Sequence, residues 1–242
     1  MINNKSVLAI IPARGNSKGL PRKNVISLAG KPLIAWIIIA ATKSKFIDKI
    51  IVSTDSKKIA KVARAYRAEV PFIRPSKFAT DKSKTFPVIK HAINFLKLKN
   101  KNFDYVVLLE PTSPLTTNQD IDIALKTLVK KRKIADSIVG VSKLEHCHPS
   151  FNVRINNKGL ISPCEGNKFR GLRRQEIKKL YFFEGSLYIS ALSVLLKKKR
   201  FLHNRTLSYK VPKWKALEID DFVDFLYAEK TILNLKKLKK NK

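Results

Sequence analysis

Short apolar runs alternate with helical patterns through the first 140 residues, and this alternation constrains the fold more than any other feature. Strands are predicted at 7–11, 49–54, 69–73, 105–109 and 137–141, with helices between them at 32–42, 56–66, 85–98 and 118–131. Such a repeat is typical of βαβ units around a mainly parallel sheet. The run at 105–109 is apolar on both faces, which indicates a strand covered by helices on both sides. We therefore predict an α/β fold.

The alternation breaks after about residue 143. Residues 143–182 contain a hairpin pattern and a polar stretch, and they are too few for a core of their own. We expect an inserted arm within a single domain spanning 1–242. A strand at 182–190 then returns to the main body, and a closing helix of about 15 residues follows Asp221. The residues expected on its buried side are Phe222, Phe225, Leu226, Ile232 and Leu233.

A basic loop, residues 13–24, follows the first apolar run in the segment LAIIPARGNSKGLPRKN. Its glycines let backbone N–H groups approach an anion, and Arg14, Lys18 and Lys23 can neutralise several phosphates. The spacing matches neither a Walker loop nor a dinucleotide fingerprint. Asn24 could hydrogen-bond a base or a ribose. A nucleoside triphosphate suits this loop best, although an ordinary solvated connection has a similar composition.

Two other strand ends are expected beside this loop, because ligands of open α/β sheets bind at the carboxyl ends of the strands. Arg74 follows one predicted strand and can face the ligand, or it can be an ordinary surface arginine. Glu110 ends the strongest strand, and Pro111 and Pro114 follow it. Prolines fix φ and remove donors, so this segment is either a rigid pocket wall or a simple strand terminator.

Glu218 and Asp220 form an acidic pair near the carboxyl terminus. In an extended segment, residues two apart point to the same side, so both carboxylates can face one divalent cation. Mg²⁺ is commonly held by one or two carboxylates together with substrate phosphates. Acidic residues just before a helix are also ordinary caps.

The charge and the cysteines narrow the function classes. Fifty basic and 18 acidic residues give a net charge of +32, which favours anionic substrates. The lysines are spread over nearly every segment without interleaved aromatic residues, so nucleic-acid binding is not favoured. Only Cys147 and Cys164 occur, no apolar run approaches a bilayer span, and no secretory signal is present. We expect a cytoplasmic protein that does not bind membranes.

With these segments assembled, the chain resembles the acylneuraminate cytidylyltransferases, the CMP-sialic acid synthetase family. The segments that carry the resemblance are IIPARGNSKGLPRKN (10–24), AGKPLIAW (29–36), VSTDSKKIAKVA (52–63), VPFIRP (70–75), ATD (79–81), PTSPL (111–115), RRQ (173–175), EGSLYIS (184–190) and WKALEIDD (214–221). The resemblance implies a three-layer, Rossmann-like nucleotide-diphospho-sugar transferase fold. It also implies transfer of CMP from CTP to a nonulosonic acid sugar, with Mg²⁺ and release of pyrophosphate, by a homodimer whose arm contributes to the sugar pocket.

Carried over by position, the resemblance assigns a role to each of several residues. The nucleotide contacts are Arg14, Lys18, Lys23, Asn24, Arg74 and Thr85, the metal ligands are Glu218 and Asp220, and the sugar-pocket arm motif is Arg173, Arg174 and Gln175. The residues expected to act in catalysis are Lys23, Arg14 and Asp220.

Three positions depart from the family pattern. Glu110 and Thr116 flank PTSPL where Gln and Arg are common, and Glu184 replaces a usual Asn. Two extra carboxylates in or near the sugar pocket favour a legionaminic-type sugar, since Glu accepts hydrogen bonds from an amine, amidine or hydroxyl. Two alternatives stay open: transfer to an octulosonate or pseudaminate, and a non-catalytic, basic nucleic-acid-binding protein on the same scaffold.

Overall fold

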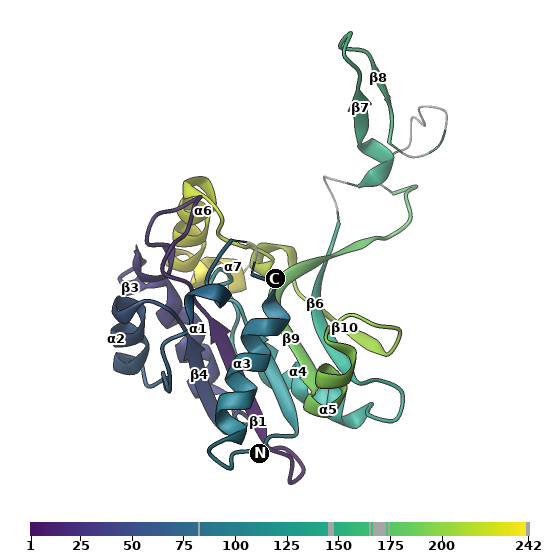
Figure 1. The fold of residues 1–242 in the computed structure, drawn as a ribbon. Helices are drawn as coiled ribbons and strands as arrows, with labels where there is room; N and C mark the ends of the chain where they lie inside the picture. The colour runs from purple at the N-terminus through teal and green to yellow at the C-terminus, as the bar shows by residue number, and fades with distance from the viewer. Residues whose placement is uncertain (82, 145–147, 165, 167–172, 174, 241–242) are drawn as a thin grey trace.

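The computed structural model describes residues 1–242 except 82, 145–147, 165, 167–172, 174 and 241–242. Its centre is a six-stranded sheet in the order β10-β6-β9-β5-β1-β4 (Figure 1). The strands of this sheet are β1 (Val7–Pro12), β4 (Lys49–Ser53), β5 (Tyr105–Leu109), β6 (Ser137–Lys143), β9 (Tyr181–Ala191) and β10 (Thr206–Lys210). The predicted mainly parallel sheet is confirmed, because β9 alone of the six runs antiparallel to its neighbours.

Helices cover both faces of the sheet, as the apolar character of its strands requires. Alternate residues of β1 enter two different cores: Ala9 packs with α1, α2 and α4, whereas Ile10 packs with α3 and α5. The helices are α1 (Leu33–Lys43), α2 (Lys57–Ala65), α3 (Thr85–Lys97), α4 (Asn118–Lys130), α5 (Leu192–Lys198), α6 (Phe222–Leu233) and α7 (Leu235–Lys240). Among the described residues, none of these helices is long and apolar enough to cross a bilayer.

Short elements complete the description. Strands β2 (Ser27–Leu28) and β3 (Lys31–Pro32) pair after the basic loop, and β7 (Val153–Ile155) pairs with β8 (Ile161–Pro163) in the predicted hairpin. That hairpin projects far from the sheet, at the end of β6 and β9 (Figure 1). Four 3₁₀ turns are η1 (Lys23–Val25), η2 (Ser76–Phe78), η3 (Pro149–Phe151) and η4 (Lys213–Lys215).

The strand predicted at 69–73 is wrong. Only isolated bridges form there, from Glu69 to Ile51 and from Ile73 to Thr54. Pro71 lies between them and has no backbone N–H, so a continuous ladder cannot form. Helix α5 and strand β10 had no counterpart in the sequence prediction.

The buried side predicted for the closing helix is only partly right. Phe225 and Ile232 are buried, whereas Phe222 is 57% exposed and Leu226 and Leu233 are also exposed. Helix α6 instead packs through Phe225, Ala228 and Ile232, at the i, i+3, i+7 spacing of a single face. This face meets Leu20 of the basic loop and Ile219 in a third core. The carboxyl-terminal segment is thereby fastened to the amino-terminal loop.

Candidate active site

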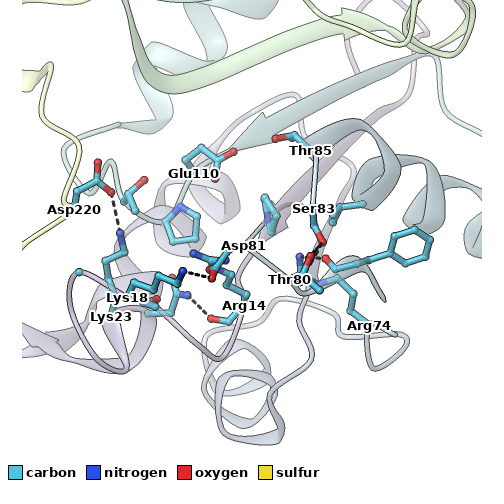
Figure 2. Close-up of a pocket in the computed structure, with 18 residues that line it drawn as sticks. Arg14, Lys18, Lys23, Arg74, Thr80, Asp81, Ser83, Thr85, Glu110 and Asp220 are labelled. Carbon is cyan, nitrogen blue, oxygen red and sulfur yellow. Dashed lines mark hydrogen bonds and ion pairs between the residues drawn. The ribbon is translucent and has the colours of Figure 1, made fainter. Parts of the chain in front are cut away.

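A cleft of about 420 Å³ opens where β1 and β5 end (Figure 2). Its wall includes eight of the residues predicted from the sequence for nucleotide, metal or substrate contacts. These eight residues are Arg14, Lys18, Lys23, Asn24, Arg74, Thr85, Glu110 and Asp220. Ligand pockets of proteins have volumes of this order, about 300–1,000 Å³.

The basic loop keeps its shape through hydrogen bonds made at its two ends. The backbone N–H of Gly15 donates to Asp55 Oδ1 at 2.8 Å, and Asn24 Nδ2 donates to the Arg14 carbonyl oxygen at 2.9 Å. Asn24 is buried, so part of its amide serves the loop itself. Its role as a nucleotide contact stays a prediction.

Lys23 joins the two ends of the chain. Its Nζ donates to the carbonyl oxygen of Ile219 at 2.7 Å and to Asp220 Oδ1 at 3.1 Å. An ammonium has three N–H donors, so these two bonds to described residues leave one for a ligand. A Cβ at Gly19 would overlap the Asp220 carbonyl oxygen, so a glycine is required for this close approach. The predicted convergence of the basic loop with Asp220 is confirmed.

Glu218 lies behind Asp220 rather than on the cleft wall. Its carboxylate accepts a hydrogen bond from Thr112 Oγ1 at 3.3 Å, and the Ile219 N–H donates to the Thr112 carbonyl oxygen at 2.9 Å. Burial, followed by the Asp220 carboxylate, raises the pKa of Glu218. Two carboxylates that repel each other beside a phosphate-sized cleft fit a hard divalent cation. Within the described part of the chain, no group of three or more His, Cys, Asp or Glu is placed to hold a metal ion.

Glu110, Glu184 and Glu218 form an acidic cluster, of which Glu110 lines the wall of the cleft. Burial and the Glu218 carboxylate raise the pKa of Glu110 to about 8. Burial raises the pKa of Glu184 to about 7, against the opposing effect of its bonds from Ser186. All three carboxylates, after burial, raise the pKa of Tyr188 to about 12, which shows that they surround one region.

Two glycines leave room for members of the acidic cluster, Gly140 for Glu184 and Gly185 for Glu218. A Cβ at Gly140 would overlap Glu184 Oε1, at the point where the β6–β9 register shifts. Gly185 has φ +77°, and a Cβ there would lie 2.9 Å from Glu218 Oε2. Glu184 Oε2 is buried without a hydrogen-bond partner among the described residues. Glu184 is not on the wall of the cleft, and its role as a sugar contact stays a prediction.

Arg74 and Thr85 form the wall opposite Asp220 (Figure 2). Arg74 is only 5% exposed, so it is not an ordinary surface arginine. Its Nη1 donates to the Phe78 carbonyl oxygen at 3.3 Å, whereas Nε and Nη2 lack a partner among the described residues. Burial lowers the pKa of Arg74. Thr85 is the first residue of α3, whose amino-terminal N–H groups favour anions.

Two of the arm residues predicted for the sugar pocket, Arg173 and Gln175, are not part of this cleft. Arg173 and Gln175 are exposed, and neither lines its wall. The Arg173 N–H donates to Glu176 Oε2 at 2.9 Å. Arg174 lies outside the described residues.

Sequence analysis missed two features of the site. Asp81 lines the cleft and pairs with Arg14 and Lys18. In the sequence, its segment ATD (79–81) contributed only to the family resemblance, and no role was predicted for Asp81. Behind the acidic segment, the buried Lys215 pairs with Asp120, which also accepts a hydrogen bond from Tyr209 Oη at 2.8 Å. A lysine in a largely apolar context next to Trp214 was the available signal for the second feature.

Comparison with protein families identifies relatives along most of the chain. Residues 8–187 match the model of a family described as Cytidylyltransferase. An N-acylneuraminate cytidylyltransferase of Streptococcus agalactiae is 34% identical over 223 residues, covering 91% of this chain and 52% of the relative. The chain therefore spans about half the length of that relative.

Other relatives match over nearly their full length. A CMP-N,N'-diacetyllegionaminic acid synthase of Legionella pneumophila is 35% identical over 227 residues, which are 93% of this chain and 95% of the relative. A pseudaminic acid cytidylyltransferase of Campylobacter jejuni is 28% identical over 223 residues, which are 92% of this chain and 94% of the relative. The solved structure of a CMP:2-keto-3-deoxy-manno-octonic acid synthetase complexed with CTP shares the fold, with a TM-score of 0.70 and 15% sequence identity. The match covers 95% of this chain and 99% of that structure.

Proposed function

Because this chain belongs to the cytidylyltransferase family, we propose that it transfers CMP from CTP to a nonulosonic, sialic-acid-like sugar and releases pyrophosphate. The observation that carries the proposal is the contact between Lys23 and Asp220, 197 residues apart in the chain. Through this contact the basic loop and the acidic segment share one cleft, which supports the proposal. The relatives named for N-acylneuraminate and legionaminic acid support the sugar class.

In the proposed reaction, the anomeric hydroxyl of the sugar attacks the α-phosphorus of CTP and pyrophosphate leaves. Transfers of this kind depend chiefly on positioning and on neutralising charge on the oxygens. Arg14, Lys18 and Lys23 hold the β- and γ-phosphates and stabilise the leaving group, and the N-terminus of α3 adds a favourable dipole. Arg74 lines the cleft, and its Nε and Nη2 lack a hydrogen-bond partner in the described part of the chain, so we assign it to the nucleoside.

Glu218 and Asp220 are the residues that would hold Mg²⁺. The donor chemistry fits, since both groups offer hard oxygen ligands and the raised pKa of Glu218 reflects a charge that a cation would relieve. When bound, Mg²⁺ would neutralise phosphate charge and help orient the reacting groups. Lys23 contributes to the same place by fixing the backbone at Ile219 and the carboxylate of Asp220.

The choice of sugar is proposed to depend on Glu110 and Glu184. Glu184 is buried, whereas Glu110 is half-buried and lines the cleft. A buried carboxylate favours a ligand that donates hydrogen bonds, because an unmatched one loses its hydration without compensation. This property supports a legionaminic-type sugar with amine- or amidine-derived groups.

Pyrophosphate release tests the proposal directly. The purified protein is assayed with each of the four ribonucleoside triphosphates and a panel containing N-acetylneuraminate, a legionaminate, a pseudaminate and a 3-deoxy-octulosonate. We expect release only with CTP and a nonulosonic acid, and formation of the CMP-sugar by mass spectrometry. Sugar-independent release, or a preference for the octulosonate, would contradict the assignment.

We also propose that two copies of the chain associate through the arm, and that the protein is cytoplasmic. Tyr181, Phe182 and Phe183 are exposed where β9 leaves the sheet, and Ile155 and Ile161 are exposed in the hairpin. Such a patch is typical of an interface. Light scattering at micromolar concentration should give the mass of a dimer for the wild type. Phe183→Glu should lower this mass, whereas the control Phe222→Glu, outside the arm, should leave it unchanged. A monomeric wild type would contradict the proposal.

A further inference from the structure

Asp81 holds two of the cations that face the cleft. Its Oδ1 lies 2.5 Å from Arg14 Nη1, and its Oδ2 lies 2.8 Å from Lys18 Nζ. Figure 2 shows the carboxylate between the two side chains. Each oxygen therefore meets a different cation, which is how two oxygens of a phosphate group would be held.

The contact is not needed to hold the loop that carries Asp81. Thr80 and Ser83 close that turn themselves, through the Thr80 N–H to Ser83 Oγ at 3.1 Å and between the two hydroxyls at 2.9 Å. The Asp81 and Lys18 side chains are 44% and 81% exposed. Exposed ion pairs are weak and are screened by solvent, so the pair can be exchanged for a stronger anion.

Charge decides which anions can make that exchange. A carboxylate carries one negative charge, whereas pyrophosphate and the β,γ end of a triphosphate carry several and offer more oxygens. Charge-assisted hydrogen bonds to phosphate strengthen with that charge. A nucleoside monophosphate has only an α-phosphate, so it has no β- or γ-phosphate to bind Arg14 and Lys18.

We propose that Asp81 competes with the outer phosphates for Arg14 and Lys18, so that it weakens the binding of CTP and pyrophosphate selectively and leaves that of monophosphates nearly unchanged. The inference rests on the proposed function, because it takes Arg14 and Lys18 to be the cations of the β- and γ-phosphates. After pyrophosphate leaves, the carboxylate takes both cations again. The remaining CMP-sugar then has no outer phosphates to compete for them.

Calorimetric binding to Asp81→Asn tests the inference. Titrations with pyrophosphate, CTP and CMP are made in chelator-containing buffer without divalent cations. We expect the substitution to lower the Kd for pyrophosphate and CTP about 3- to 10-fold, since the carboxylate that competes for Arg14 and Lys18 is removed. The Kd for CMP should change less than about 2-fold on the same scale. Asp81→Ser, which also lacks the charge, should behave alike, and melting curves show that both variants fold.

Glu69→Gln is the matched control. Glu69 is exposed, pairs with Lys49 and does not line the cleft, so its loss changes the net charge equally. A gain in pyrophosphate affinity with this control equal to that of Asp81→Asn would overturn the inference, as would an equal gain for CMP. If the wild type binds pyrophosphate and Asp81→Asn binds it no tighter, this inference alone fails. If the folded wild type binds neither pyrophosphate nor CTP, the proposed function fails with it.

Discussion

Charged side chains have different surroundings in the basic loop and in the acidic cluster. On the basic loop, Arg14, Lys18 and Lys23 are each paired with a carboxylate, Asp81 or Asp220, at a partly exposed position. In the acidic cluster, Glu184 is buried and Glu110 is half-buried, and burial raises the pKa values of both. Paired, exposed charges are screened and exchange partners readily, whereas buried charges without a partner are costly. We infer that the basic side sets affinity for phosphates, and that the acidic side makes the protein sensitive to pH and to cations.

The strongest test of this contrast is the buried pair behind the acidic segment. Lys215→Met leaves the Asp120 carboxylate buried without its cation, and breaking such a pair lowers the free energy of unfolding by about 3–5 kcal/mol. Urea unfolding measures the loss. Lys90→Met, an exposed lysine in the middle of α3, is the control and should change stability by less than about 0.5 kcal/mol. Equal stabilities of the two variants would contradict the contrast between buried and exposed charge.

A second test compares two neighbouring carboxylates, Asp220, which we assign to catalysis, and Asp221, which caps a helix. Asp220 is 76% exposed, so Asp220→Ala should lower kcat about 100-fold or more, as removal of a charge-stabilising group does, with little change in melting temperature. Asp221, the N-cap of α6, accepts a hydrogen bond from the Asp224 N–H at 2.9 Å. Asp221→Ala should instead lower stability by about 1 kcal/mol. Near-wild-type turnover in Asp220→Ala would defeat the assignment of Asp220.

A third test concerns the pH dependence of stability. The pKa of Glu110 is about 8 in the fold against a model value of 4.5, so the native state binds the extra proton. Its contribution therefore favours folding at low pH and is lost as the pH rises through about 8. Glu110→Gln should raise Tm at pH 9 relative to the wild type, by about 2–4 °C for each kcal/mol recovered, and change it little at pH 5. Parallel Tm curves for the two proteins, without divalent cations, would contradict the raised pKa.

Much of the site could be predicted because its residues lie where strands end. The basic loop follows β1 and Glu110 follows β5, and parallel strands bring such ends to one edge. The neighbours of Glu184 were harder to predict from the sequence, because they depend on a shift in the β6–β9 register beside Gly140. Likewise, Asp81 reaches Arg14 only through the conformation of a loop.

The closing helix shows why periodicity alone can mislead. Phe222, Leu226 and Leu233 are apolar yet exposed, so α6 has apolar residues on more than one face. The face that packs is the one that includes the small residue Ala228, which allows close approach to the core around Leu20 and Ile219. Which face packs was therefore decided by the shape of a surface far away in the sequence.

The glycine at position 19 has a consequence for how the protein is made. Because its missing side chain admits the Asp220 backbone, the cleft is assembled from two segments that are far apart in the chain, where Lys23 and Asp220 are separated by 197 positions. A nascent polypeptide on the ribosome can form β1 and its loop early, yet it has no complete cleft until translation passes residue 220. The activity that we propose would therefore be absent from any translation product that stops short of that point.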